Sequence, residues 1–252
     1  MRSSRRAFLT KLTAGLSIPF LVDLERMSAI AAAGDRETIL SQRRNTPDGH
    51  FDLRGWKLQI PGPKEVKNLG RYSSEYFYLD SSEHMCFWVD CSETGYTTNS
   101  DYVRSELRHL GEWSVNDSAP KVLSAQVSVN SHANPDKVTV LQVHSTNSNG
   151  RSIPPLLRIA LNHGSLRAFV KTDNSGNRTE SIVLDSNVSG QAINCAIEVH
   201  DGRLIISING TEKVNRDISF WQHPSYFKAG CYPQSNRGTV TAKFSHLSVE
   251  VS

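Results

Sequence analysis

Short stretches of alternating apolar and polar residues, separated by turn-forming residues, constrain this chain more than any other feature of its sequence. They recur from about residue 50 to the end, and Asn162-His163-Gly164 and Asp201-Gly202 between them are hairpin-turn signals. Alternation places one face of each strand in a core. We therefore expect an all-β protein, either a β-sandwich or a β-jelly roll. The stretches expected to be strands are 56–60, 85–89, 102–109, 122–129, 138–144, 156–161, 166–172, 192–200, 204–209, 226–232 and 240–251.

The first 33 residues have the order of a leader peptide. Arg5-Arg6 precedes Phe8-Leu9, a modest apolar stretch follows, and Ala31-Ala32-Ala33 offers a small-residue cleavage pattern. This order predicts a signal peptide of the twin-arginine type. We therefore expect a protein that is exported to the periplasm or the extracellular space.

The domain organisation follows from that leader. We expect the signal peptide over 1–33, an N-terminal extension over 34–49 and a single β-domain over 50–252. No uncharged apolar run of about 18 residues is present, so we expect no membrane-spanning helix and no membrane partner.

The formal net charge of +3 comes from the leader, because residues 1–33 hold five basic and two acidic residues. The remainder of the chain is neutral. A nucleic-acid-binding domain usually carries its own basic excess, so we expect no nucleic-acid partner. Any anionic ligand must be held by a local stripe of positive charge.

Three of the expected strands have one apolar face and one face rich in Arg, Gln, His, Lys and Tyr. Solvated faces more often mix Ser, Thr, Lys and Glu, so these three faces indicate a binding groove, although simple solvated faces are the alternative. The residues on them are Arg104, Glu106 and Arg108; Gln142 and His144; and Tyr226, Lys228 and Tyr232, with Gln234 if the last strand continues.

These same segments resemble the three signature segments of the alginate lyases of polysaccharide lyase family 7. The resemblance rests on 104–108 (RSELR), 142–144 (QVH) and 226–234 (YFKAGCYPQ), in the family's order, and it extends over roughly residues 50–252. It implies a β-jelly roll whose concave sheet forms the substrate groove. It also implies a lyase that cleaves alginate, an anionic polysaccharide, by β-elimination at the 1,4 bond.

The resemblance also implies roles for single residues. Elimination removes the proton at C5 of a uronate, next to a carboxylate whose charge must be neutralised, and a forked guanidinium and an amide suit that task. Tyr232 would be the acid, and also the base where proton and leaving group lie on one side of the sugar; His144 would be the base for the opposite geometry. The expected catalytic residues are Arg104, Gln142, His144 and Tyr232, and the expected substrate-binding residues are Glu106, Arg108, Tyr226, Lys228 and Gln234.

Glu106 is expected to orient the arginines, because a free carboxylate would repel the polymer. The scheme needs no metal and no cofactor, and we expect a monomer. Val143 is similar to the form associated with mannuronate-rich substrate. Pro233 departs from the family pattern, and it is expected to end the strand and weaken any role for Gln234.

Three other functions compete with this interpretation. A lyase on another polyuronate, such as glucuronan, would use the same chemistry. A glycoside hydrolase would need two facing carboxylates, which no expected strand supplies. A non-catalytic carbohydrate-binding module or lectin would need aromatic platforms but no His–Tyr pair.

The four cysteines, Cys86, Cys91, Cys195 and Cys231, are not spaced like a zinc site. We expect at most one disulfide among them. Cys231 is expected on the core side of its strand, near Cys195.

Overall fold

The computed structural model describes residues 46–251 except 63, 95–99, 133–136 and 189. The expected leader and most of the expected extension therefore lie outside the described residues. Within them the regular structure consists of strands: β1 Trp56–Ile60, β2 Lys64–Val66, β3 Phe77–Leu79, β4 Met85–Asp90, β5 Ser105–His109, β6 Lys121–His132, β7 Lys137–Thr146, β8 Ser152–Asn162, β9 Ser165–Lys171, β10 Thr179–Asp185, β11 Ile193–His200, β12 Arg203–Ile208, β13 Thr211–Asp217, β14 Ser225–Pro233 and β15 Thr239–Val251.

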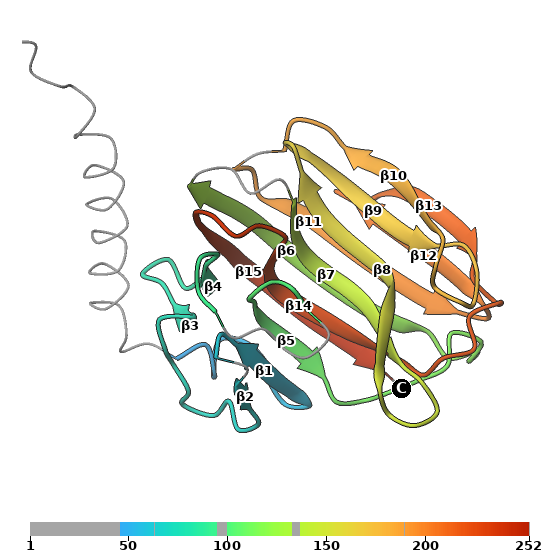
Figure 1. Cartoon of the computed structure of the whole chain (residues 1–252), viewed down its shortest axis with the longest axis horizontal. Coiled ribbons are helices and arrows are strands. Elements are labelled where there is room, and N and C mark those ends of the chain that lie inside the picture. The colour runs from blue at the N-terminus through green and yellow to red at the C-terminus, as the bar shows by residue number, and fades with distance from the viewer. Residues whose placement is uncertain (1–45, 63, 95–99, 133–136, 189, 252) are drawn as a thin grey trace, which may run out of the picture.

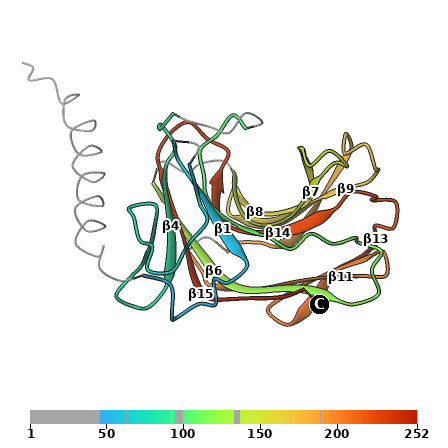
Figure 2. The ribbon, with the colours of Figure 1, turned by 90° about the horizontal axis from the view of Figure 1, so that it is seen from below.

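The strands form two antiparallel sheets that pack face to face (Figure 1). One sheet has eight strands in the order β10-β9-β8-β7-β14-β5-β1-β2, and the other has seven in the order β13-β12-β11-β6-β15-β4-β3. The expected all-β jelly roll is confirmed. Figure 2 shows the eight-stranded sheet bent into a trough above β14 and β8, with the seven-stranded sheet beneath it.

The apolar faces of both sheets meet in one core. Phe227 of β14, Leu107 of β5 and Leu141 of β7 come from the eight-stranded sheet, and Phe87 and Phe244 come from the other. All five are fully buried. Because strand side chains alternate, burying these residues turns their neighbours onto the concave face of the eight-stranded sheet.

Two expected hairpins form where the turn signals lie. His163 and Gly164 have positive φ angles of 48° and 79°, as do Asp201 and Gly202 at 47° and 69°. Two consecutive residues with positive φ match the right-handed twist of the flanking strands. The turns therefore join β8 to β9 and β11 to β12 without a long loop.

The structure differs from the expected strands in a few places. The short strands β2, β3, β10 and β13 were not expected. The strand expected over 102–109 begins only at Ser105, so Arg104 lies just before it. Strand β14 ends at Pro233, as expected from the fixed φ and missing N–H of proline.

Candidate active site in the concave sheet

The three polar segments become neighbours at the centre of the concave sheet. Strand β14 lies between β7 and β5. Lys228 of β14 is opposite Arg108 on one side and Gln142 on the other, and Tyr226 is opposite His144. Pairing in the sheet thus collects side chains that are up to about 120 residues apart in the chain.

Glu106 is the buried anion at the centre of the site. Its Oε2 lies 2.5 Å from Nζ of Lys228 and 3.4 Å from a guanidinium nitrogen of Arg104, and its Oε1 accepts a hydrogen bond from Gln142. Its side chain has no exposed surface. Glu106 therefore orients Arg104, as expected, but it also holds Lys228 and Gln142, and it does not contact Arg108 in the described structure.

Lys228 is almost fully enclosed, and its Nζ also donates to Oε1 of Gln59 at 2.8 Å. Burial lowers the pKa of Lys228 to about 8, although the charge of Glu106 acts in the opposite direction. The ammonium therefore loses its proton at a lower pH than an exposed lysine does.

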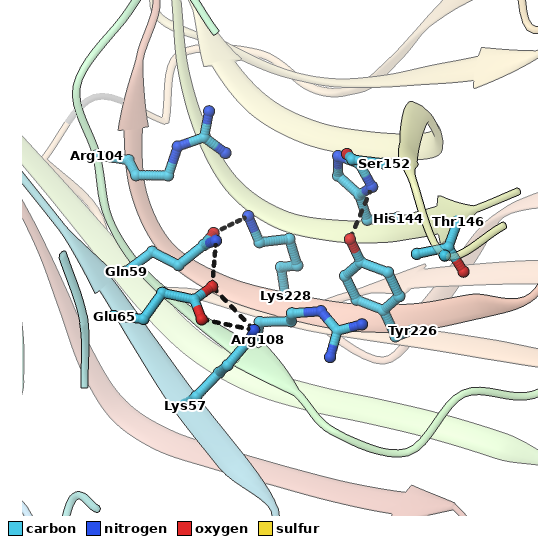
Figure 3. Close-up of a pocket in the computed structure, with 11 residues that line it drawn as sticks. Lys57, Gln59, Glu65, Arg104, Arg108, His144, Thr146, Ser152, Tyr226 and Lys228 are labelled. Atoms are coloured by element: carbon cyan, nitrogen blue, oxygen red, sulfur yellow. Dashed lines mark hydrogen bonds and ion pairs between the residues drawn. The ribbon is translucent and has the colours of Figure 1, made fainter. Parts of the chain in front are cut away.

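His144 has a defined environment at its Nδ1 atom. The backbone N–H of Ser145 donates to Nδ1 at 2.8 Å. The hydroxyl of Tyr226 lies 3.1 Å from the same atom, and Figure 3 shows this contact. Burial raises the pKa of Tyr226, so its hydroxyl keeps a proton to donate. Burial and then the charge of Lys228 lower the pKa of His144 well below its usual range. The ring is neutral near pH 7.

An amide proton cannot dissociate at this pH, so an Nδ1 atom that accepts it cannot carry a proton of its own. The neutral ring of His144 then holds its proton on Nε2. The carbonyl oxygen of Ser145 lies 3.2 Å from Nδ1 and would accept from it in the other tautomer. A proton on Nδ1 would point at the Ser145 N–H, and two donors would then face each other. The tautomer with the proton on Nε2 is therefore favoured.

Tyr232 is held by two neighbours. Its hydroxyl lies 3.0 Å from Oγ of Ser100, which itself donates to the carbonyl oxygen of Tyr102 at 2.9 Å. The guanidinium of Arg104 stacks on the Tyr232 ring, with Cζ 4.0 Å from its centroid. This stack and the Ser100 contact fix the position of the Tyr232 ring and hydroxyl in the groove.

A second Arg–Tyr stack lies on the other side of His144. Cζ of Arg108 is 3.9 Å from the ring centroid of Tyr226. The same guanidinium is 2.5 Å from Oε1 of Glu112, whose Oε2 accepts from Thr146 at 3.1 Å. Arg108 is therefore paired with a carboxylate while it lines the larger cavity, and its expected role in binding substrate stays a prediction.

Gln234 lies beyond the end of β14 and is not among the residues that line the cavities described next. Its Nε2 donates to Thr139 at 3.1 Å, and its Oε1 lies 3.4 Å from a guanidinium nitrogen of Arg158. Gln234 thus contacts Arg158, which lines the smaller cavity, and its expected role in binding substrate stays a prediction.

The site opens into two adjoining cavities of about 400 and 340 Å³. Arg104, His144 and Ser152 line both of them. The larger one extends over β5, β1 and β2 and includes Tyr226 and Lys228, whereas the smaller one extends over β7 and β8 and includes Tyr232. Together they form one groove that crosses the strands.

The groove also includes residues that the sequence did not single out. Among these are Lys57, Gln59, Ser152 and Arg158, with the prolines at 154 and 155. Alternation in 56–60 already puts Lys57 and Gln59 on one polar face, so that signal was present. Arg158 lies in the groove because it is opposite Gln142 in the pairing of β7 with β8, and no local sequence pattern indicates that pairing.

The described residues contain no group of three or more His, Cys, Asp or Glu side chains that could hold a metal ion. They also contain no helix long and apolar enough to cross a membrane.

All four cysteines are buried free thiols, which is consistent with the expected limit of one disulfide. Cys231 faces the core, as expected, and burial raises the pKa of its thiol well above the usual range; the neighbouring thiol that adds to this effect is Cys91. The expected position of Cys231 near Cys195 therefore has no support.

Known proteins resemble this chain both in sequence and in fold. A family model described as alginate lyase matches residues 51–251. An alginate lyase from Photobacterium sp. is 26% identical over 246 residues, 79% of this chain and 84% of that protein. The crystal structure of alginate lyase A1-II', described as a member of polysaccharide lyase family 7, is 31% identical with a TM-score of 0.75 and covers 81% of this chain and 97% of its own.

An alginate lyase from Pseudomonas aeruginosa gives a TM-score of 0.71 at 27% identity, over 80% of this chain and all of that one. These matches do not favour glucuronan lyase or a non-catalytic module. Since the family model spans almost all of the expected domain and the motifs meet in one groove, the chain belongs to the alginate lyase family, within polysaccharide lyase family 7.

Proposed function

We propose that this alginate lyase acts by β-elimination on mannuronate-rich segments, with Tyr232 as both base and acid. The observation that carries the proposal is the hydrogen bond from the Ser145 amide to Nδ1 of His144, at 2.8 Å. It leaves the Nε2 proton of a neutral His144 available to the groove. His144 is then a hydrogen-bond donor in the resting enzyme and not a base.

Three side chains can neutralise the carboxylate next to C5. Arg104 has guanidinium nitrogens beyond the one near Glu106, and Gln142 has a second amide proton beyond the one that Glu106 accepts. Nε2–H of His144 adds a third donor. Donors fixed before the substrate arrives stabilise the negative charge that develops during elimination.

Tyr232 can then perform both proton transfers. In mannuronate the C5 proton and the C4 oxygen lie on the same side of the ring, so one group can reach both. The phenolate of Tyr232 would take the C5 proton, the C4–O bond would break as the C4–C5 double bond forms, and the new phenol would return the proton to the departing oxygen. Arg104, stacked on the ring, holds Tyr232 in position for both transfers.

A second candidate is cleavage of guluronate blocks, where proton and leaving group lie on opposite sides. There His144 would have to accept the C5 proton on Nε2, with its own proton moved to Nδ1. The carbonyl oxygen of Ser145, 3.2 Å from Nδ1, could accept a hydrogen bond from the resulting Nδ1–H. The cost is the lost hydrogen bond from the Ser145 amide, so we expect slower turnover of guluronate.

The relative A1-II' supports the proposal that one histidine and one tyrosine take part in the reaction. A variant of it in which one histidine and one tyrosine are replaced has been solved with substrate, at 30% identity to this chain and a TM-score of 0.76. In this chain His144 and Tyr232 line one cavity, with Gln142 and Arg104 beside them.

Turnover of separated mannuronate and guluronate oligomers tests the proposal. Tyr232→Phe removes one hydroxyl and should lower kcat about 100- to 10,000-fold on both substrates. His144→Gln keeps an N–H donor but no base. It should keep mannuronate activity within about 10- to 100-fold of the wild type, the range of one hydrogen bond to a charged group, and lose guluronate activity.

Circular dichroism should show that both variants are folded. A folded Tyr232→Phe protein with near-normal turnover would refute the assignment of Tyr232. Equal and complete losses for His144→Gln on both substrates would show that His144 is the base in each case. The wild type should also cleave mannuronate oligomers faster than guluronate oligomers of equal length.

A further inference from the structure

A cluster of positive charge lies on the concave sheet at the end of the groove formed by β7, β8 and β9. It consists of Lys137 on β7, Arg158 on β8, and Phe169 and Lys171 on β9, and we call it the distal cluster. Arg158 is opposite Phe169 in the sheet. Nζ of Lys137 lies 4.2 Å from the Phe169 ring centroid, and Cζ of Arg158 lies 5.6 Å from it.

Arg158 is close enough to each of the two lysines for its charge to oppose theirs. Burial lowers the pKa of each, and the charge of Arg158 lowers the pKa of Lys137 and of Lys171 further. Neighbouring like charges in a partly buried site are unfavourable unless an opposite charge or an aromatic ring compensates for them. Phe169 offers its ring face to two of them, which offsets only part of that repulsion.

No carboxylate pairs with these cations in the part of the chain that the structure describes. The polar contacts of Arg158 and Lys171 there are to neutral groups, Gln234 at 3.4 Å and Thr179 at 2.9 Å. Asp173 acts on Lys171 electrostatically, but its carboxylate is paired with Arg178 at 2.9 Å. The distal cluster therefore carries an excess of positive charge that a bound anion would relieve.

The distal cluster also continues the groove. Arg158 lines the smaller cavity together with Tyr232. From Tyr232 on β14 the sheet order runs β14-β7-β8-β9, so Phe169 is three strands away. Adjacent strands are about 4.8 Å apart, which places Phe169 and Lys171 on β9 roughly 14 Å across the sheet from β14, about the length of three pyranose rings. Lys137 starts from β7, but its Nζ lies 4.2 Å from the Phe169 ring centroid and so reaches toward β9.

We propose that the distal cluster is a subsite for the carboxylate of a uronate about three sugars from the bond that is cleaved. The proposal rests on the proposed function, because it requires a polyuronate to lie across the strands through the catalytic groove. Lys137 and Lys171 contact the carboxylate, Arg158 bridges this subsite to the catalytic part, and Phe169 holds Lys137 and Arg158 in place. The enzyme then gains catalytic efficiency when its substrate is long enough to reach β9.

The test compares kcat/KM on a series of uronate oligomers from the shortest that the wild type cleaves to chains several sugars longer. Lys137→Met with Lys171→Met removes two charges and keeps most of the apolar stems. We expect this double variant to equal the wild type on the shortest oligomer and to lose about 10-fold or more on the longest. Lys213→Met, an exposed lysine on β13 of the other sheet, is the matched control and should follow the wild type at every length.

Calorimetric binding of the longest oligomer in a Tyr232→Phe background gives a second measurement, with about a 10-fold weaker Kd expected for the double variant. An equal loss of kcat/KM at all lengths would mean that the two lysines act only through the overall positive potential of the groove. No loss on long oligomers would mean that the lysines do not contact substrate. Either result overturns the subsite. Preference for guluronate in the wild type would overturn the mannuronate proposal alone, because the length series can be repeated on guluronate.

Discussion

Single residues in this site are held by their neighbours before any substrate arrives. The carboxylate of Glu106 contacts Lys228, Gln142 and Arg104 at once, and it has no exposed surface. A buried carboxylate is tolerable only when its partners compensate its charge. We infer that Glu106 fixes donors for the substrate and does not itself react.

The lowered pKa of Lys228 predicts how the activity depends on pH. The ammonium is the form that attracts a uronate, and it is lost as the pH rises through about 8. We therefore expect kcat/KM for alginate to fall above that pH. Arginine keeps its charge to much higher pH, so Lys228→Arg should move the fall to higher pH. The measurement is kcat/KM against pH for both proteins.

Thermal unfolding at each pH separates this effect from loss of structure. If Lys228→Arg is folded and its activity declines over the same pH range as the wild type, another group is responsible for the decline.

Strand β14 is the element on which the site depends, since it joins the Arg104 segment to the His144 segment. Gly230 lies opposite Glu106, with a φ of 152°. A Cβ there would lie 2.5 Å from the carbonyl oxygen of Ser105 and 2.6 Å from Cα of Glu106. Both are backbone atoms, so a larger residue would push β14 away from β5.

We expect Gly230→Ala to destabilise the fold by several kcal/mol, more than the roughly 1–3 kcal/mol of backbone strain alone, and to abolish most activity. Gly210→Ala is the control, because Gly210 also has a positive φ, 77°, but no atom lies within 4 Å of the added Cβ. Urea unfolding and kcat of both variants check this. Similar losses for the two would mean that the close approach to β5 is unimportant.

At the scale of the whole molecule, a chain with little net charge holds a basic groove, and its N-terminal residues have the order of an export signal. We propose that the protein is exported by the twin-arginine route, which brings it to polymeric substrate outside the cytoplasm. Replacing Arg5 and Arg6 with lysines should retain the precursor in the cytoplasm, as immunoblotting of cell fractions would detect. Unchanged export would point to a different route.

The sequence by itself determined which side chains face the groove. Side-chain alternation is a local property of a strand, so the apolar partners Leu107, Leu141 and Phe227 were enough to orient their polar neighbours. The turn at Asp201-Gly202 was equally local, because two residues tolerant of positive φ define it. For these reasons the all-β fold and one polar face of each motif could be predicted.

Only the tertiary structure decided how those faces meet. Strand order is set by packing between segments far apart in the chain, and alternation carries no information about it. The pairing of Arg158 with Gln142 and the enclosure of Glu106 both follow from that order. The tautomer of His144 likewise depends on the local backbone bend that brings the Ser145 amide to Nδ1, where β7 departs from regular pairing.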